Sequence, residues 1–140
     1  MRITLLSTLA LALLAGCAST PQLEAAPTTS APTSAETIPA HLLGTWTYTA
    51  ERNGQVVNGD YILTADPAGH RMGAPGLVSN EVQNSFLVVN GEAVTWTGVL
   101  RTMGGPAGFR ITGTLVDSTV TGTNEIDGLG TYAFSATKVQ

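Results

Sequence analysis

Charge and cysteine are both scarce in this chain. Only 11% of its residues are charged, and the arginines and the lysine are scattered without a basic run. Nucleic-acid binding needs a concentrated basic patch, so we expect no nucleic-acid partner. Cys17 is the single cysteine, and therefore no disulfide can form within the chain.

Motifs for catalysis or metal binding are also missing. The two histidines, His41 and His70, stand in no H-E-x-x-H or H-x-H spacing, and no G-x-S-x-G occurs. The aspartates flanked by glycine, proline or serine are Asp60, Asp66, Asp117 and Asp127. Such positions are typical of turns, although Asp117 and Asp127 leave a cation site as the alternative. We expect no enzymatic activity, no cofactor and no metal; an enzyme remains an alternative only through residues that folding brings together.

The N-terminal apolar run is too short to span a membrane. It extends from Ile3 to Ala15 after a cationic start at Met1-Arg2. A span needs about 20 apolar residues, whereas about a dozen after a positive charge are typical of a secretory signal. Residues 1–16 are therefore predicted to be a signal peptide.

The end of this signal carries a more specific pattern. Leu14-Ala15-Gly16-Cys17 resembles the lipobox of bacterial lipoproteins. The resemblance implies cleavage before Cys17, a diacylglyceryl group on its thiol, and acylation, for example with palmitate, of the new amino terminus. Ala18 and Ser19 follow where aspartate would retain the protein in the inner membrane, so a Gram-negative source implies the periplasmic face of the outer membrane. The alternative is an ordinary signal with a chance cysteine.

Composition divides the mature chain into a linker and a domain. Residues 17–40 are rich in alanine, proline, serine and threonine, and their sizeable apolar side chains are Leu23 and Ile38. Such a segment cannot bury enough surface to offset its ordering entropy, so we interpret it as a semi-extended tether. A structured arm is the alternative. Residues 41–140 hold all the aromatic residues and form one predicted domain.

Alternation with period 2 recurs through this domain and predicts an all-β fold. The predicted strands are 44–51, 55–65, 77–89, 92–102, 109–116, 119–124 and 132–137, with an irregular strand in 70–76, a loop at 103–108 and one helical turn in 38–44. Turn residues every 8–12 positions favour an antiparallel meander of roughly eight strands, closing as an up-and-down barrel. A flattened sandwich is the alternative. Gly98, Gly113 and Gly122 are predicted at bulges or barrel corners.

Two stretches of the domain resemble known patterns. Gly44-Thr45-Trp46, opening the first strand, resembles the entry of lipocalins and avidins, where a G-x-W triplet closes one barrel end. That resemblance implies a cation–π contact of Lys138 with Trp46. Residues 109–139 resemble a recurring pattern of small secreted bacterial β-domains.

The residues that we single out as ligand-lining or as barrel-end packing are Trp46, Tyr48, Trp96, Arg110, Tyr132, Phe134 and Lys138. Packing is the simpler reading of the aromatic residues, and an outward, solvated position is the simpler reading of Arg110 and Arg101. The sequence therefore predicts a membrane-anchored, non-catalytic binding or structural module for a small apolar ligand or an envelope protein. The alternative is a periplasmic protease inhibitor, because inhibitors of bacterial metalloproteases also resemble small barrels with a G-x-W entry.

Overall fold

The structure, a computed structural model, describes residues 37–140. These residues fall in a single compact unit, Ser34–Gln140, with its own core. The predicted signal peptide, the lipobox and Cys17 lie outside the described residues.

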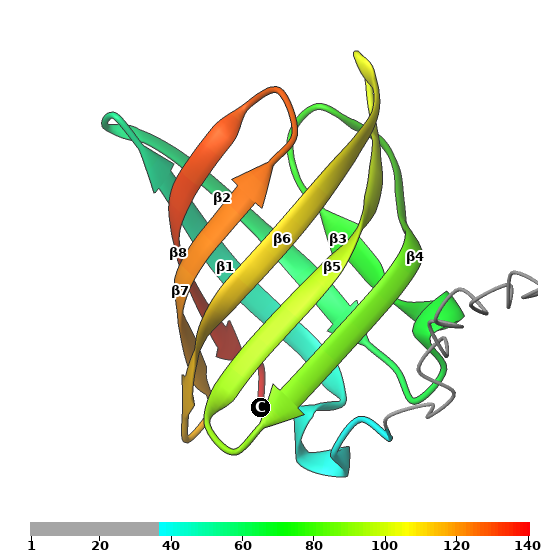
Figure 1. The fold of residues 1–140 in the computed structure, drawn as a ribbon, viewed down its shortest axis with the longest axis vertical. Coiled ribbons are helices and arrows are strands. Elements are labelled where there is room, and N and C mark those ends of the chain that lie inside the picture. The colour runs from blue at the N-terminus through cyan, green and yellow to red at the C-terminus, as the bar shows by residue number, and fades with distance from the viewer. Residues whose placement is uncertain (1–36) are drawn as a thin grey trace, which may run out of the picture. The chain divides into compact units, whose positions relative to one another are not determined.

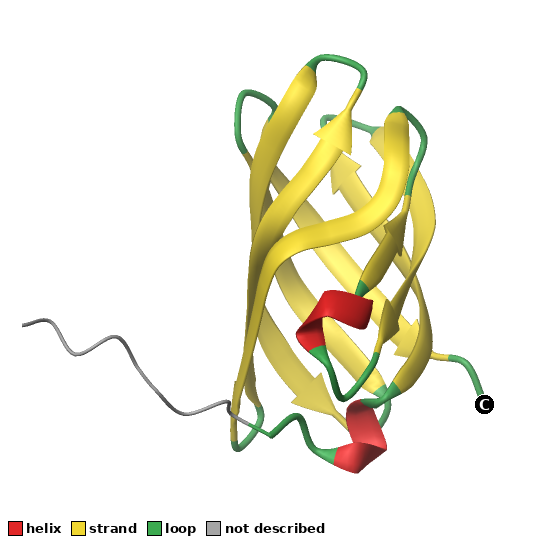
Figure 2. Cartoon of the chain, turned by 90° about the vertical axis from the view of Figure 1, so that its right-hand side faces the viewer, coloured by secondary structure: helices red, strands yellow, loops and turns green. Residues whose placement is uncertain are grey.

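Eight antiparallel strands form a closed barrel in which each strand pairs with its sequence neighbours and β8 returns to β1 (Figure 1). The strands are β1 (Gly44–Arg52), β2 (Gln55–Leu63), β3 (Arg71–Gly73), β4 (Leu77–Asn90), β5 (Ala93–Thr102), β6 (Gly105–Val116), β7 (Thr119–Ile126) and β8 (Gly130–Lys138). Two short 3-10 turns, η1 (Ala40–Leu42) and η2 (Pro67–Gly69), lie toward one end (Figure 2). The predicted all-β barrel is confirmed.

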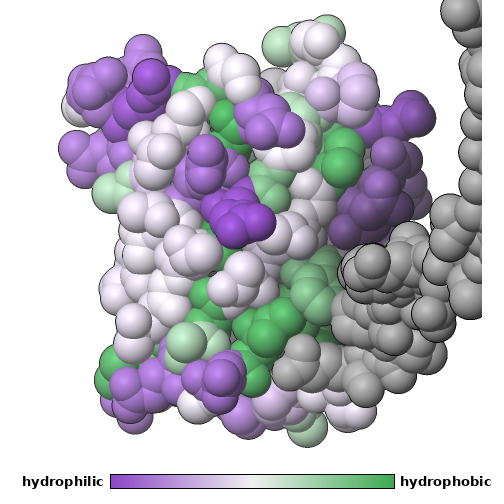
Figure 3. All heavy atoms as spheres, viewed as in Figure 1, coloured by the Kyte–Doolittle hydropathy of each residue, from purple (hydrophilic) through white to green (hydrophobic). Residues whose placement is uncertain are grey.

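Alternation along the strands separates a packed interior from a hydroxyl-rich wall. In β1, Trp46, Tyr48 and Ala50 are buried while the intervening threonines are exposed. The wall formed by β7 and β8 is of near-neutral hydropathy, and hydrophilic residues gather at the β1–β2 hairpin (Figure 3). Threonine suits this position because its branched side chain favours extended backbone without exposing a large apolar surface.

The two barrel ends differ. We call the end that carries the β1–β2, β3–β4, β5–β6 and β7–β8 connections the hairpin end, and the opposite one, with η1 and the C-terminus, the entry end (Figure 1). At the hairpin end, Asn53 and Gly54 have φ of 52° and 77°, as a two-residue type I′ turn requires.

The entry end is plugged by the residues before β1. Ile38 and Leu42 are buried, and the Trp46 indole N–H donates to the Leu42 carbonyl at 2.9 Å. Ile38 thus belongs to the core, although composition placed it in the linker. Lys138 pairs with Trp46 in the β1–β8 register, and its ammonium donates to the His41 carbonyl at 2.6 Å.

The prediction of a loop at residues 103–108 is wrong for residues 105–108, because β6 begins at Gly105. The Asp127 N–H donates to the Gly108 carbonyl, so the hydrogen-bonding backbone groups of Gly108 point toward the β7 side of the strand. Residues two positions apart in a strand point these groups to the same side, so those of Pro106 also point toward the β7 side. Because β7 ends at Ile126, opposite Phe109, the N–H that proline lacks has no strand partner to lose.

The prediction of bulges is confirmed at Gly98 and wrong at Gly113 and Gly122. Between the pairs Gln83–Val99 and Phe86–Thr97, two residues of β4 lie opposite Gly98 alone, which is a bulge. The β6–β7 register, in contrast, runs without a shift through Gly113 opposite Gly122. These glycines mark close approaches, since a Cβ on Gly122 would lie 2.5 Å from the Cα of Gly113. The register shifts are in β4, where Asn84 has φ of 50°.

Candidate functional site

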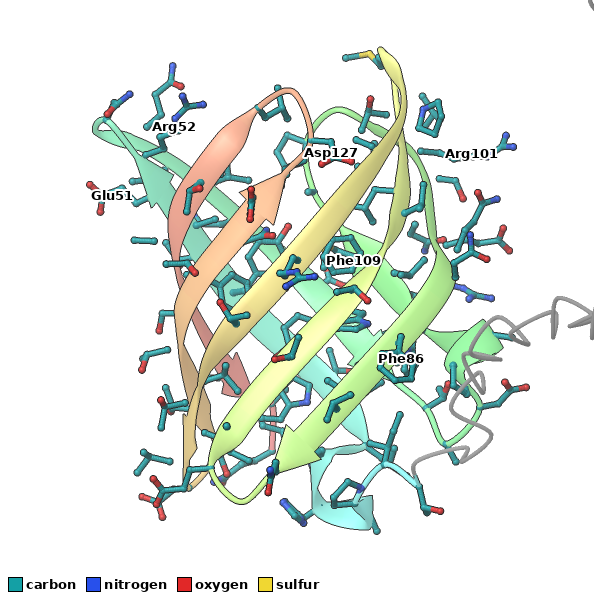
Figure 4. The ribbon with its side chains drawn as sticks, viewed as in Figure 1. Glu51, Arg52, Phe86, Arg101, Phe109 and Asp127 are labelled. Carbon is teal, nitrogen blue, oxygen red and sulfur yellow. The ribbon has the colours of Figure 1, made fainter. Side chains whose placement is uncertain are left out.

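A layer of aromatic rings divides the barrel interior. Tyr61 stacks on Trp46 at 5.7 Å between ring centroids and lies 5.2 Å from Trp96, which meets Phe109 edge-on at 5.2 Å. Phe109 points into the interior behind β5 and β6 (Figure 4). Toward the entry end, the side chains of residues 37–140 leave a void of about 20 Å³, room for about one water molecule. This half of the barrel is filled by side chains.

The other half encloses a larger space, which we call the hairpin-end cavity. Its volume is about 180 Å³, and its wall includes Tyr48, Met72, Leu100, Asn124, Ile126 and Tyr132. An apolar cavity of about 150 Å³ in another protein holds a benzene molecule. The hairpin-end cavity therefore has room for a ligand about the size of one ring system.

Asn124 is the polar residue buried in this wall. It is only 3% exposed, and its Oδ1 has no hydrogen-bond partner among residues 37–140. It stands on the inward side of β7, in line with Val120 and Ile126, so its amide replaces an apolar side chain at an interior position. A buried acceptor without a partner is unfavourable, and a ligand that supplies a donor would remove this penalty.

Tyr48 lies at the junction between the aromatic layer and the cavity. Its ring centroid is 5.5 Å from that of Phe134, and its hydroxyl donates to the Gly73 carbonyl at 3.2 Å. Burial, together with the negative charge of Asp60, raises the pKa of the Tyr48 phenol to about 12. The phenol is therefore neutral at ordinary pH and keeps the proton that it donates.

Apolar residues are exposed around the mouth of the cavity. Leu129, in the β7–β8 turn, lines the cavity and is 50% exposed, and Met103, in the β5–β6 turn, is 81% exposed. Arg52 lies over the ring of Tyr132 at 5.8 Å, while Arg101 extends away from the barrel (Figure 4). The mouth thus offers apolar contacts with charges held at its outer edge.

A hydrogen-bonded network also occupies the interior beside η2. His70 is fully buried; its Nε2 lies 3.0 Å from the Thr64 carbonyl and its Nδ1 2.6 Å from Ser85 Oγ. Since a carbonyl only accepts, Nε2 carries the proton and Nδ1 accepts from the Ser85 hydroxyl, which in turn accepts from the Trp96 indole at 2.8 Å.

This network is structural rather than catalytic in its geometry. Ser85 and His70 resemble a nucleophile and its base in their spacing, but neither lines the hairpin-end cavity. The Trp96 indole N–H also donates to Ser85 Oγ, and the His70 imidazole is not exposed to solvent. Burial is the largest influence on the pKa of His70 and lowers it, so the ring is held neutral.

The singled-out residues separate into groups. Trp46, Trp96 and Phe134 line the small entry-half void, whereas Tyr48 and Tyr132 line the hairpin-end cavity. Arg110 is exposed on the outer wall of β6, beside Glu125 and Asp127 in a shallow groove. Lys138 lies at the entry end. The interior aromatic residues are thus brought together, and the two basic residues are not part of that group.

Asn124 and His70 were not expected as interior polar residues. The signal for Asn124 was present, because Val120, Gly122, Asn124 and Ile126 share the inward side of β7. No comparable pattern in the sequence pointed to His70. Its partner Ser85 faces the interior because the register shift at Asn84 reverses which residues of β4 point inward.

No protein-family model, curated protein or solved structure matches this chain. Across residues 37–140, no helix is long and apolar enough to cross a membrane. The same residues contain no cluster of three or more histidine, cysteine, aspartate or glutamate side chains suited to a metal ion.

Proposed function

We propose that this chain is a lipid-anchored cell-envelope protein whose β-barrel binds a small apolar molecule without catalysing a reaction on it. The observation that carries this function is the hairpin-end cavity, about 180 Å³ in volume and mostly apolar in its wall. Ligand sites are typically concave, largely apolar and furnished with few polar groups. The aromatic layer beneath the cavity forms its floor.

The barrel is suited to a direct test because Ser34–Gln140 form a compact unit with its own core. We expect this fragment, purified under native conditions, to carry a small molecule detectable by native mass spectrometry. Ala74, in the connection between β3 and β4, lines the cavity, so Ala74→Phe should fill its mouth and remove the adduct. Ala133→Phe adds the same ring to the exposed wall of β8 and should retain the adduct.

A wild-type barrel without an adduct, or an adduct unaffected by Ala74→Phe, would contradict binding in this cavity. The first result would favour the alternative of a protease inhibitor, whose inhibitory arm would come from the linker before the barrel.

The anchored location is the second part of the proposal, and the Leu14-Ala15-Gly16-Cys17 motif supports it. Lipid on Cys17 would hold the barrel in the cell envelope, on the periplasmic face of the outer membrane in a Gram-negative source. One acyl chain binds a membrane only weakly, so stable attachment needs the several chains of a mature lipoprotein.

We expect Cys17→Ser to abolish globomycin-sensitive processing and to move the full chain from the membrane fraction to the soluble fraction. Ser19→Ala, which leaves the motif intact, is the matched control and should still sediment with membranes. If the Cys17→Ser variant also sediments with membranes after a salt wash, lipidation at this residue is wrong.

A further inference from the structure

The hairpin-end cavity combines an unpartnered acceptor with a wall that carries no ionisable acid or base other than phenols. We propose that its ligand is a neutral, mostly apolar molecule with a hydrogen-bond donor at one end, and that this donor binds Oδ1 of Asn124. This assignment rests on the proposed binding function of the cavity and adds the chemical class of the ligand.

The case for a donor starts from the burial of Asn124. Its Oδ1 is shielded from solvent and has no partner in residues 37–140, although the side chain lines the cavity. An O–H or N–H group of a ligand in the cavity is the complement that this atom lacks. The other polar group at the cavity floor, the Tyr48 hydroxyl, already donates to the Gly73 carbonyl.

The case for a neutral ligand comes from the rest of the wall. No aspartate, glutamate, lysine, arginine or histidine lines the cavity within the described part of the chain. A charged ligand group would lose its hydration there without gaining an oppositely charged partner. The proton that Tyr48 keeps prevents the phenol from becoming an anionic partner.

Strand register gives the orientation of the ligand. Asn124 pairs with Ile111, which lines the small entry-half void, so Asn124 lies at the inner end of the hairpin-end cavity. Leu129 lies at the mouth, half exposed. The donor therefore enters first, and the apolar body of the ligand packs along Leu100 and Ile126 toward Leu129.

Indole and benzofuran test this assignment because they share a shape, while only indole has an N–H to donate. By isothermal titration calorimetry on the Ser34–Gln140 fragment, we expect indole to bind about tenfold more tightly than benzofuran. Asn124→Leu, which branches at Cγ as asparagine does but carries no polar atom, should remove this preference by weakening indole alone. Asn58→Leu, at an exposed position on β2, should leave the preference intact.

The outcomes separate the donor assignment from the binding function. Equal affinities of the two probes for the wild-type barrel would overturn the Asn124 assignment and leave cavity binding intact. Binding of neither probe would overturn both. If Asn124→Leu does not fold, the comparison of the two probes on the wild-type barrel still decides the assignment.

Discussion

Two polar side chains buried inside this barrel, Asn124 and His70, are in opposite states. Both ring nitrogens of His70 have partners, in Thr64 and Ser85, whereas Oδ1 of Asn124 has none in the described part of the chain. A satisfied buried group fixes its neighbours, because each partner would be left unpaired without it. An unsatisfied one is energetically unfavourable, and a ligand that pairs with it removes that cost. At the residue scale, His70 is therefore structural and Asn124 is the binding candidate.

The neutral state of His70 predicts a pH dependence of folding. Burial lowers the pKa of His70 below its ordinary value of 6.5, so the unfolded chain binds this proton more readily than the folded one. Stability is then fully present above about pH 6.5 and falls as the pH drops below it. Protonation would also put a hydrogen on Nδ1, where the Ser85 hydroxyl now donates.

Urea unfolding at about pH 7.5 and about pH 5.5 measures this effect. We expect the wild-type midpoint to fall at the lower pH, and His70→Gln to lose most of that fall. His41→Gln is the control because His41, the other histidine of the chain, is exposed. A fall in His70→Gln as large as in the wild-type protein would show that other groups cause it.

At the scale of elements, the close contact of β6 with β7 depends on a glycine pair. Gly113 and Gly122 stand opposite each other, and a Cβ on Gly122 would overlap the Thr112 carbonyl oxygen and lie 2.5 Å from the Cα of Gly113. Both atoms belong to the backbone, so the two strands would have to separate to make room. The pair thus sets the distance between these strands.

We expect Gly122→Ala to lower the free energy of unfolding by about 2–3 kcal/mol, as overpacking of a tight site does. Gly104→Ala, in the β5–β6 turn, is the control: its Cβ would meet its nearest neighbour, Thr102 Oγ1, at 3.7 Å. That change should stay within about 0.5 kcal/mol. Equal effects of the two substitutions on the urea midpoint would refute a close approach at Gly122.

Whole strands could be predicted from the sequence where alternation was unbroken, as in β1 and β5. The start of β6 could not be predicted, because its glycine and proline residues are typical of loops. Pro106 is tolerated in the strand because β7 ends before reaching it, and the sequence does not show where β7 ends. The cavity could not be predicted either. The inward-facing positions carry large rings in one half of the barrel and smaller side chains such as Ala50 in the other. Only the strand register shows which of these residues lie at the same height along the barrel axis.

At the scale of the molecule, the barrel depends on a plug that precedes its first strand. Ile38 and Leu42 are 7% and 3% exposed, Leu42 accepts from the Trp46 indole, and Lys138 of the last strand donates to the His41 carbonyl. The entry end is thus closed by residues that sequence composition divided between linker and domain. The plug also joins the beginning of the fold to its end.

A barrel that begins at Gly44 should therefore be less stable than one that begins at Ser34. Loss of two buried aliphatic side chains predicts a decrease of about 3–6 kcal/mol in the free energy of unfolding, measured by urea denaturation. The Trp46 indole should also become exposed, which shifts its fluorescence to longer wavelength. The fragment from Ser34 carrying Ala40→Ser, at an exposed position of η1, should unfold like the unaltered fragment. Equal midpoints for the fragments from Gly44 and from Ser34 would mean that the strands alone hold the barrel closed.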